Sequence, residues 1–528
     1  MRYPPIFACL IVFAPLYAYA VPSVQNIIDH GAATDGKTLC TAAIQKAIDT
    51  CAKNGGGTVL FPKGTFLSGA IHLKNGVRLQ FDEGSTLRGS RDRKDYYGTQ
   101  FDKDGRAIKN SRKFYSLISG QDLQDIAITG SGTINGSGGA FRDKTKARPK
   151  NIYLESCRGV LVEGVRLRDS GSWMQHYRLC EDVTIRNVDI FNHITFNNDG
   201  LDIDSCRNVK ISGCRIDSDD DAIVLKSLSR RPCENVTVND CIISSHCNSI
   251  KCGTESGGGF VNIRVSNCKV FSPKKSKKIY GRQRGSAGIA LEIVDGGRME
   301  NVRISDIDIT GLSAAIFLRL GNRARPYVKG DEPAIGTMRD ICISRIKARN
   351  IMPIGCAISG LPGHMIEDVQ FEEIDLEFEG GGSKKLAGRT PGERPVSYPE
   401  CTMFGDLPGY GFFCRHVRDI QFKNITLKVQ HPDKRHAMVF DDAENVVIAG
   451  LQASAAADGC ATIRLTQTRG AELSNITMSG PNVKLLALTG DKTSGIVLNK
   501  LEMKDPEKFV ERGHEVSQKA LRIFLKKE

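Results

Sequence analysis

Short stretches of alternating apolar and polar residues recur along most of the chain. Each ends in a polar pair followed by an apolar residue or Cys, as in Val160–Val165, Val183–Val188 and Val209–Cys214. Strict alternation over a few residues predicts a strand with one buried face. The last residue of each stretch falls at positions 165, 188, 214, 241, 268, 307, 346, 374, 425, 451, 476 and 501. A repeat period in the range of roughly 20–50 residues indicates an array whose successive units stack on one another.

We therefore predict an all-β solenoid with parallel stacking of its coils, rather than a β-sandwich of antiparallel hairpins. Asn-Gly and Asp-Gly two-residue loops, which are typical of hairpins, rarely separate the stretches. Three steps are long: 268 to 307, 307 to 346 and 374 to 425. They predict coils that carry inserted loops, and such loops commonly carry function.

The two ends of the array are predicted to differ from its middle. Residues 42–48 predict an amphipathic helix that ends at Asn54 and the glycine triplet 55–57. This helix would cover the open end of the apolar core, so that 21–90 form a cap with the first coils and 91–505 form the main β-helix. Residues 506–528 predict a second amphipathic helix, a C-terminal helical tail.

The segment Met1–Ala20 resembles a secretory signal. Arg2 supplies a positive start, an apolar stretch follows from Ile6 to Tyr17, and Ala18-Tyr19-Ala20 has the small residues of a cleavage site. No later segment has the apolar length that a membrane span needs. We expect a secreted or periplasmic protein without a membrane span, and a monomer.

Charge points to the kind of partner. Lys and Arg number 73 against 60 Asp and Glu, which gives a net charge of +13. For an exported protein, this balance favours an acidic polysaccharide over nucleic acid. The basic residues are dense in Lys274–Lys278 with Arg282 and Arg284. The sequence leaves two interpretations of this run open: it attracts the substrate, or it is a solvated loop.

Sixteen of the 17 Cys lie beyond Ala20. Cys214, Cys241 and Cys268 occupy the last position of their stretches, where other coils have Val or Ile. We expect an interior row of small hydrophobic side chains there, although disulfides between neighbouring coils remain open. No Cys or His cluster has the spacing of a zinc site, and we expect neither a structural metal nor a cofactor.

Acidic residues recur at nearly the spacing of the repeat. His176, Asp199, Asp221 and His246 follow one another in steps of 23, 22 and 25, and Asp220 precedes Asp221. With one coil per repeat, these side chains would form a column on one wall. Carboxylates gathered in this way repel one another, which raises the pKa of one of them. Cleavage of a glycosidic bond needs a protonated carboxyl group beside an ionised one. Solvated turn residues are the alternative interpretation.

At these residues the chain resembles family 28 of the glycoside hydrolases, the polygalacturonase-like enzymes. The family's Asn-Thr-Asp, Asp-Asp and Gly-His-Gly signatures are matched by Asn197–Asp199, Asp220–Asp221 and Ser245–Cys247. The resemblance implies a right-handed parallel β-helix with a short N-terminal capping helix. It also implies hydrolysis, with inversion, of a pectin-type polysaccharide or oligosaccharide. By position, Asp220 would be the general acid, Asp199 and Asp221 would bind and activate water, and His246 would support the acid.

The remaining candidates would bind the substrate. They are Asn197, His176, Asp202, Lys226, Lys251, Arg319, Arg323, Arg415 and His416. Arginines beside aromatic residues in the late segments suit stacking on sugars and holding carboxylates. One departure concerns the Arg-Ile-Lys signature with which polygalacturonases grip the galacturonate carboxylate. Ala290-Leu291-Glu292 stands there instead, which implies weaker binding of an acidic sugar at that place.

Two other functions fit a solenoid of this kind. A polysaccharide lyase on the same fold would use an Arg or Lys base, usually with Ca²⁺ held by acids. A non-catalytic solenoid would bind carbohydrate without cleaving it, and its binding would survive replacement of Asp220.

Overall fold

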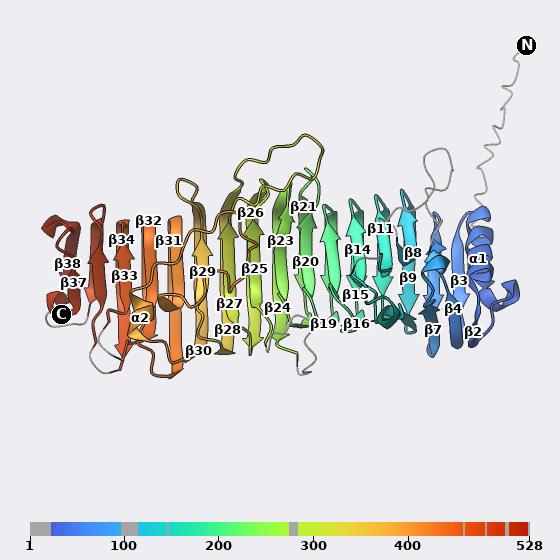
Figure 1. Ribbon diagram of the computed structural model, residues 1–528, viewed down its shortest axis with the longest axis horizontal. Helices are drawn as coiled ribbons and strands as arrows, with labels where there is room; N and C mark the ends of the chain where they lie inside the picture. Colours follow the sequence, from blue (N-terminus) through green and yellow to red (C-terminus); the bar gives the residue numbers. More distant parts are fainter. Residues whose placement is uncertain are drawn as a thin grey trace, which may run out of the picture.

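The computed structural model describes residues 23–96, 115–144, 147–273, 284–457, 460–480, 483–501 and 506–525. The chain winds into a right-handed parallel β-helix, which confirms the predicted fold class (Figure 1). From β3 (Gly57–Phe61) to β21 (Cys233–Asn239) each strand pairs in parallel with the strand three places further along the chain, so that one coil contributes one strand to each of three sheets. In later coils the step is two places or fewer. The predicted signal segment and the basic run 274–278 lie outside the described residues. Among the described residues, no helix is long and apolar enough to cross a membrane.

One sheet, here called the site sheet, carries most of the candidate residues. Its strands are β5 (Ile71–His72), β8 (Ser116–Gln121), β11 (Lys150–Glu155), β14 (Gln175–Arg178), β17 (Leu201–Asp204), β20 (Ile223–Ser227), β23 (Ile250–Ser256), β25 (Ala287–Ile293), β27 (Ala314–Leu320), β29 (Cys356–Ser359), the first parts of β31 (Gly409–His431) and β32 (His436–Ser454), β33 (Ile463–Thr466), β35 (Leu486–Thr489) and β37 (Val510–Arg512).

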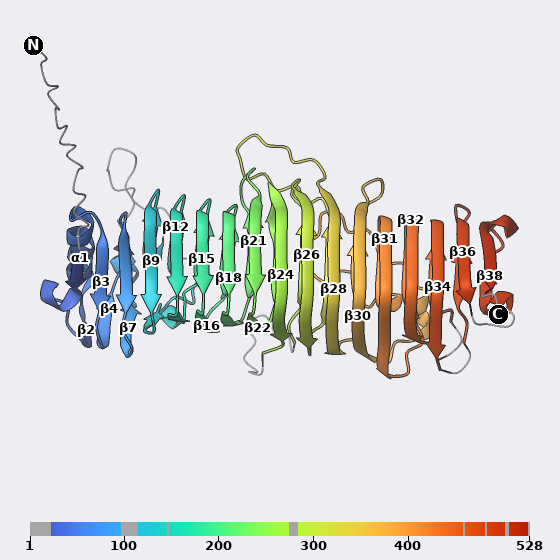
Figure 2. The same ribbon diagram turned by 180° about the vertical axis from the view of Figure 1, so that it is seen from behind.

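The second sheet runs the length of the molecule on the opposite side (Figure 2). Its strands are β1 (Ser23–Asn26), β3 (Gly57–Phe61), β6 (Val77–Phe81), β9 (Gln124–Gly130), β12 (Arg158–Glu163), β15 (Glu181–Arg186), β18 (Arg207–Ser212), β21 (Cys233–Asn239), β24 (Gly259–Phe271), β26 (Arg298–Thr310), β28 (Thr337–Ile351), β30 (Ile366–Gly380), later parts of β31 and β32, β34 (Arg469–Ser479), β36 (Ser494–Leu501) and β38 (Leu521–Leu525).

The third sheet is formed by short strands in the first half of the molecule. They are β2 (Asp35–Leu39), β4 (Gly64–Ser68), β7 (Ser85–Gly89), β10 (Thr133–Asn135), β13 (Arg166–Arg168), β16 (Asp189–Asn192), β19 (Arg215–Ser218) and β22 (Ile242–Ser245). From β24 onward the second and third sheets share long strands, because β24 pairs with both β21 and β22.

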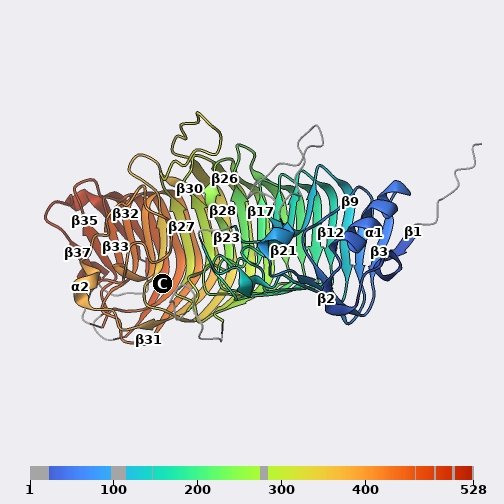
Figure 3. The same ribbon diagram turned by 45° about the vertical axis from the view of Figure 1, so that its right-hand side comes forward.

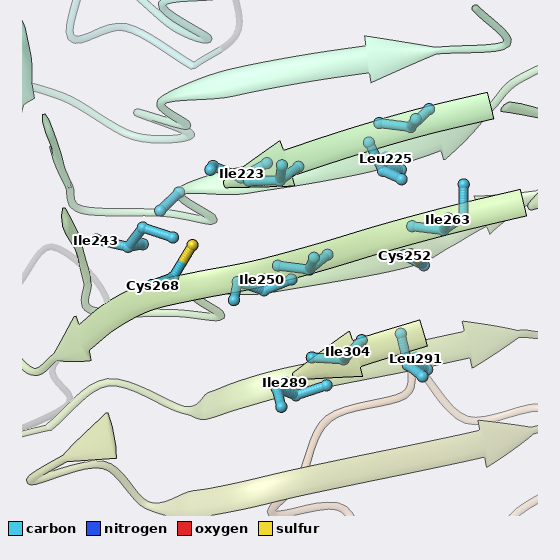
Figure 4. Close-up of a cluster of buried hydrophobic side chains, with 14 of the residues drawn as sticks. Ile223, Leu225, Ile243, Ile250, Cys252, Ile263, Cys268, Ile289, Leu291 and Ile304 are labelled. Carbon is cyan, nitrogen blue, oxygen red and sulfur yellow. The ribbon is translucent and has the colours of Figure 1, made fainter. Parts of the chain in front are cut away.

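The core consists of identical positions stacked coil upon coil. Ile223, Ile250 and Ile289 lie in register on β20, β23 and β25 (Figure 4). The last residues of the repeated sequence stretches are also in register from coil to coil: Cys268, Ile307, Ile346, Ile374, Ile425, Leu451 and Ile476. Each stacked row removes its apolar surface from water along the whole helix axis.

The cysteine row is interior, as the sequence predicts. Cys214, Cys241 and Cys268 are buried, and all three are free thiols. Each thiol donates to the backbone carbonyl two residues earlier, at 3.4, 3.3 and 3.3 Å. They therefore serve as small packing groups rather than as disulfide links.

Helix α1 (Thr41–Lys53) covers the N-terminal end of the core (Figure 3). Its apolar face buries Ile44, Ala47, Ile48 and Cys51. The helix ends at Lys53, and its C-cap residue Asn54 leads into the glycine triplet. The N-terminal capping helix is thus confirmed.

The predicted C-terminal helix is wrong. Within 506–525 the chain forms two short 3₁₀ turns, Pro506–Phe509 and Gln518–Ala520, and the strands β37 and β38. Leu521 and Ile523 pair with Ile496 and Leu498 of β36. Their spacing of two fits a strand, and pairing with the last coil satisfies a sheet edge that a helix would leave open.

The long steps of the repeat correspond to inserted loops. Residues 321–336 join β27 to β28, and residues 381–408, which include α2 (Lys384–Ala387), join β30 to β31. The loop at 321–336 lies beside the site sheet through Arg323 and Tyr327. In the described part of the chain, the remaining helical segments are 3₁₀ turns at Ile27–His30, Arg93–Tyr96 and Gly138–Ala140.

Asparagines near the start of successive strands of the second sheet, from β18 to β26, form a ladder between coils. Asn235 donates to the Asn208 amide oxygen at 3.0 Å, Asn262 donates to Asn235 at 2.9 Å, and Asn301 donates to Asn262 at 2.7 Å. All four have φ between +53° and +57°. Asn adopts this left-handed conformation more readily than other non-glycine residues because its side chain can bond locally.

Replacing Asn235 by Ala is expected to lower the free energy of unfolding by about 2 kcal/mol, because two hydrogen bonds are lost and Ala resists positive φ. Asn235→Gly removes the same bonds without the conformational cost, so its loss should be smaller. Urea denaturation of the two variants measures the difference, with exposed Lys210→Ala as control. Equal losses for Ala and Gly would contradict the conformational part of this prediction.

Candidate active site

The three predicted aspartates lie in turns that lead into adjacent strands of the site sheet. Asp199 precedes β17, and Asp220 and Asp221 precede β20. One carboxylate oxygen of each residue lies within 4.8 Å of those of the other two. Asp220 and Asp221 are neighbours in sequence, but the turn frees them from the alternation of a strand. The structure therefore brings the three carboxyl groups together.

Their environments differ. Asp199 is fully surrounded by protein, and burial together with the charges of Asp202 and Asp220 raises its pKa well above the ordinary value. Burial also opposes ionisation of Asp221, but the ammonium groups of Lys251 and Lys226 and the amide of Asn248 outweigh it and lower its pKa. Asp220 is only partly buried. The cluster therefore combines a carboxyl group that retains its proton with one that stays ionised, as acid–base chemistry requires.

Two buried lysines bind these acids. Lys251 Nζ lies 3.0 Å from Asp221 Oδ2, and Lys226 Nζ lies 3.4 Å from Asp199 Oδ2 and 3.1 Å from Asp202 Oδ1. Burial opposes the charge of both lysines, but their acidic partners hold the pKa of each well above its ordinary value. Asp202, also buried, has its pKa raised to about 7 by desolvation despite Lys226. Lys226, Lys251 and Asp202 thus all belong to the cluster.

Two asparagines position the catalytic candidates. Asn248 donates from its backbone and its side chain to Asp221 Oδ1, at 3.1 and 2.9 Å. Asn197 donates to Asp220 Oδ2 at 3.4 Å and is itself held by Arg148, 2.9 Å from its amide oxygen. Asn248 was not among the sequence candidates. Its position, one coil after Asp221, is the signal that identifies it.

His176 borders the cluster on the N-terminal side. It stacks in register with Asp202, and its ring contacts Lys150 Nζ at 2.8 Å and Asp204 Oδ2 at 3.3 Å. Burial and the nearby Lys150 lower its pKa to about 3, so the ring is neutral. The ring of Trp173, partly exposed, lies edge-on to His176 and 4.0 Å from Lys226 Nζ.

His246 lies in a different column from Asp199 and Asp221. Its ring Nδ1 is 3.2 Å from Asp219 Oδ1, and its ring centroid is 5.4 Å from that of His193. Backbone pairing explains this, because Ser245 aligns with Ser218 and thus His246 with Asp219. The single column predicted from the sequence is therefore corrected: the structure contains two. Counting along the chain fails here because the repeat from Ser218 to Ser245 is 27 residues long, whereas His246 follows Asp221 by only 25 residues.

The late arginines and His416 are bound to protein groups of the inserted loops. Arg319 and Arg415 are buried; Arg319 donates to the Glu393 and Arg394 carbonyls, at 2.8 and 3.2 Å, and Arg415 pairs with the Glu393 carboxylate. His416 contacts that carboxylate at 3.1 Å. In this arrangement the three residues anchor the loop 381–408.

Arg323 holds the other loop, 321–336. Its Nε donates to Asp295 at 2.9 Å, and its guanidinium lies 3.9 Å from Glu255, which in turn lies 3.9 Å from Lys226. Arg323 is thus linked to the aspartate cluster through Glu255, a residue that sequence reasoning missed. Of the four late candidates, it is the one that the structure brings to the cluster in this way.

Glu292 and Tyr398 border the cluster on the C-terminal side. Glu292 is buried, lies 3.9 Å from Lys251 Nζ, and accepts from Thr254 at 3.1 Å. Burial raises its pKa to about 8, against the opposing charge of Lys251. Tyr398, from the loop 381–408, is 55% exposed, and its ring lies 5.6 Å from Lys251 Nζ. Exposed aromatic rings on either side of a carboxylate cluster suit the apolar faces of sugars.

The pattern of the glycosyl hydrolases family 28 matches residues 51–387, which include the whole aspartate cluster. The chain belongs to this family. A probable polygalacturonase of Vitis vinifera is 32% identical over 221 residues, 38% of this chain and 44% of that protein. An exo-poly-alpha-D-galacturonosidase of Dickeya chrysanthemi is 38% identical over 125 residues, which are 22% of this chain and 20% of that protein. The chain thus spans less than half the length of either curated relative.

Solved structures agree on the fold of this family 28 member. The hyperthermoactive exopolygalacturonase of Thermotoga maritima superposes with a TM-score of 0.58 at 24% identity, covering 77% of this chain and 92% of that one. The polygalacturonase of Erwinia carotovora ssp. carotovora superposes with a TM-score of 0.52 at 20% identity, covering 70% and 95%. At these identities the likeness establishes the β-helix alone.

Proposed function

We propose that this family 28 protein hydrolyses glycosidic bonds of an acidic pectin-type polysaccharide or oligosaccharide. The observation that carries the proposal is the convergence of Asp199, Asp220 and Asp221, one oxygen of each within 4.8 Å of the others. Such a cluster provides a proton donor for the departing oxygen and a carboxylate that activates water. Similarity to a probable polygalacturonase of Vitis vinifera and to an endo-polygalacturonase of Pectobacterium parmentieri supports this assignment.

Each aspartate has a distinct proposed role. Asp220, the most exposed of the three, protonates the glycosidic oxygen. Asp221, kept ionised by Lys251, removes the proton from the attacking water. Asp199, whose pKa is raised, holds the water from the other side. Water held between Asp199 and Asp221 attacks the sugar directly. From the resemblance to the polygalacturonase-like enzymes, we propose that the anomeric configuration inverts.

The environment of Lys226 and Lys251 disfavours a lyase. A lyase base must accept a proton from the sugar, whereas these lysines are buried among carboxylates and have pKa values well above the ordinary value. They therefore remain protonated near neutral pH. We assign them to fixing the ionisation of the aspartates.

The substrate is proposed to contain neutral as well as acidic sugars. The net charge of +13 attracts a polyanion. Beside the cluster, however, Lys251 is engaged by Asp221, and Glu292, with a pKa of about 8, is a neutral hydrogen-bond donor at neutral pH. A hydroxyl group of an uncharged sugar fits there better than a carboxylate, as in a rhamnogalacturonan-like chain. We also propose export, which rests on the segment Met1–Ala20.

The test is product analysis with a panel of pectic fragments. The purified protein should release new reducing ends from galacturonan or rhamnogalacturonan fragments without ultraviolet absorbance, and the first product should show inverted anomeric configuration by NMR. Faster turnover of fragments with alternating neutral sugars would support the role of Glu292. Products that absorb ultraviolet light and form only in the presence of Ca²⁺ would establish a lyase. Binding of the fragments without any product would establish a carbohydrate-binding solenoid.

A further inference from the structure

Beside the aspartate cluster, three turns carry a second group of polar side chains at equivalent positions of successive coils. Asn192, Ser218 and Ser245 pair in register, and the residues that follow them are His193, Asp219 and His246. Backbone bonds continue the alignment, from Asp219 N to the Asn192 carbonyl at 3.0 Å and from His246 N to the Ser218 carbonyl at 3.2 Å. The coil spacing thus holds two imidazoles on either side of one carboxylate.

Their polar atoms point to one place. Asp219 Oδ1 lies 3.2 Å from His246 Nδ1 and 3.8 Å from His193 Nδ1, and one ligand atom of each residue lies within 4.8 Å of the others. Asp219 is 0% and His246 2% exposed. Among the described residues, neither oxygen of Asp219, neither nitrogen of His246 nor Nδ1 of His193 has a hydrogen-bond partner. Buried lone pairs without partners are costly, which indicates that something else satisfies them.

A further contact orients His193. Its Nε2 lies 2.8 Å from Asp217 Oδ1, so Nε2–H donates to that carboxylate, and in the neutral ring the Nδ1 lone pair is directed toward Asp219. A carboxylate behind a histidine in this way fixes the tautomer of metal ligands in many proteins. Two donors bound to one Zn²⁺ at about 2.1 Å in tetrahedral geometry lie about 3.4 Å apart. The separations of 3.2 and 3.8 Å lie on either side of this value.

We propose that His193, Asp219 and His246 bind a divalent transition-metal cation of the Zn²⁺ type. Two imidazole nitrogens with one carboxylate favour Zn²⁺, Mn²⁺, Fe²⁺ or Co²⁺ over the oxygen-seeking Ca²⁺ and Mg²⁺. The inference revises the expectation of no structural metal, which rests on the spacing of ligands close together in sequence. These ligands lie on three successive coils, far apart along the chain, and only the stacking of the coils brings them together.

The cation would fix the turns that carry the catalytic candidates. Asp219 directly precedes Asp220, and Ser245, directly before His246, donates to the Asp220 carbonyl at 2.6 Å. Coordination bonds from one metal ion to ligands on three coils would hold these turns in one arrangement. The cation is thus assigned a positioning role, and the proposal does not depend on the substrate or on hydrolysis.

The test is metal binding by the full chain after treatment with a chelator. Isothermal titration with Zn²⁺ gives stoichiometry and affinity, and Co²⁺ absorption spectra distinguish nitrogen and oxygen ligands from thiolates of the many cysteines. We expect one site without thiolate bands. His246→Gln and His193→Gln should each weaken Zn²⁺ binding about a hundredfold or more, and Asp217→Asn about tenfold to a hundredfold. The control is His514→Gln, because His514 is fully exposed.

Competing explanations give other results. If the two histidines are protonated and simply share the charge of Asp219, the wild type binds no Zn²⁺, which overturns the proposal. Binding that survives both histidine substitutions but is lost in Asp220→Asn would place the cation among the three aspartates and would also overturn it. Thermal unfolding with and without Zn²⁺ shows whether each variant folds and whether Zn²⁺ stabilises it. Asp217→Asn retains all three ligands, so its weaker binding tests the proposal even if a histidine variant folds poorly. Weaker binding at lower pH would support imidazole ligands, which must be neutral to bind.

Discussion

Asp220→Asn is expected to lower kcat on a pectic substrate by about three orders of magnitude or more, with little change in KM. The amide retains the size of the side chain but cannot protonate the departing sugar oxygen, and general acid catalysis contributes about 10²–10⁴-fold to a rate. Because the leaving oxygen of a glycoside is a poor leaving group without a proton, we place the effect at the upper part of this range. Initial rates of reducing-end release measure it.

The matched control is Asp308→Asn, since Asp308 is exposed on β26, away from the site sheet. That variant should retain full activity. A substrate with a good leaving group, such as an aryl glycoside of the same sugar, should be affected much less by Asp220→Asn, because its departing oxygen needs no proton. Equal losses on both substrates would assign Asp220 to water activation and leave the acid to Asp199.

The fold can be predicted from the sequence because the alternating apolar residues of each strand mark its buried face. Alternation in Val183–Val188 identifies a strand, and the recurrence of such stretches identifies stacking, which the register from Cys268 through Ile476 confirms. The C-terminal segment is not predicted correctly, because the apolar residues of Leu521–Leu525 suit both a helix and a strand. Only the free edge of β36 decides between the two.

The site is less predictable than the fold because its residues lie in turns, where the strand register and not a constant count along the chain decides which side chains are neighbours. Counting residues placed His246 with Asp221, whereas the strand register places it with Asp219. The ion pairs of Lys226 and Lys251 depend on side chains that reach across neighbouring coils, which spacing alone does not reveal. Arg319 has the chemistry of a sugar-binding group, but its guanidinium group donates hydrogen bonds to backbone carbonyls of the loop 381–408.

Lys251→Met is expected to lower kcat about a hundredfold at slightly acid pH, because the ionised form of Asp221 loses its main support. Lys251 Nζ lies 3.0 Å from Asp221, and burial alone would raise the pKa of that carboxyl group. Removal of the cation therefore raises the pKa of Asp221 and leaves less of the base ionised. General-base catalysis contributes about 10²–10⁴-fold, which sets the scale of the loss.

The sign of the pH dependence distinguishes this effect from simple damage to the site. In the wild type the lowered pKa of Asp221 keeps the base ionised down to acid pH, so activity falls only when the pH drops through that lowered value. In Lys251→Met the acid limb of the kcat profile should move to higher pH, and activity should recover partly as the pH rises. Circular dichroism checks folding, since an unpaired buried carboxylate costs about 3–5 kcal/mol.

Lys210→Met is the matched control, because Lys210 is exposed on β18 of the opposite sheet. Its profile should coincide with that of the wild type. Glu292→Gln serves as a second comparison: Glu292 also lies near Lys251, but its pKa of about 8 already makes it neutral at acid pH. An acid limb that moves in Lys251→Met and not in Glu292→Gln assigns the titration to Asp221. An unmoved limb with uniformly lower activity would mean that Lys251 binds the substrate instead.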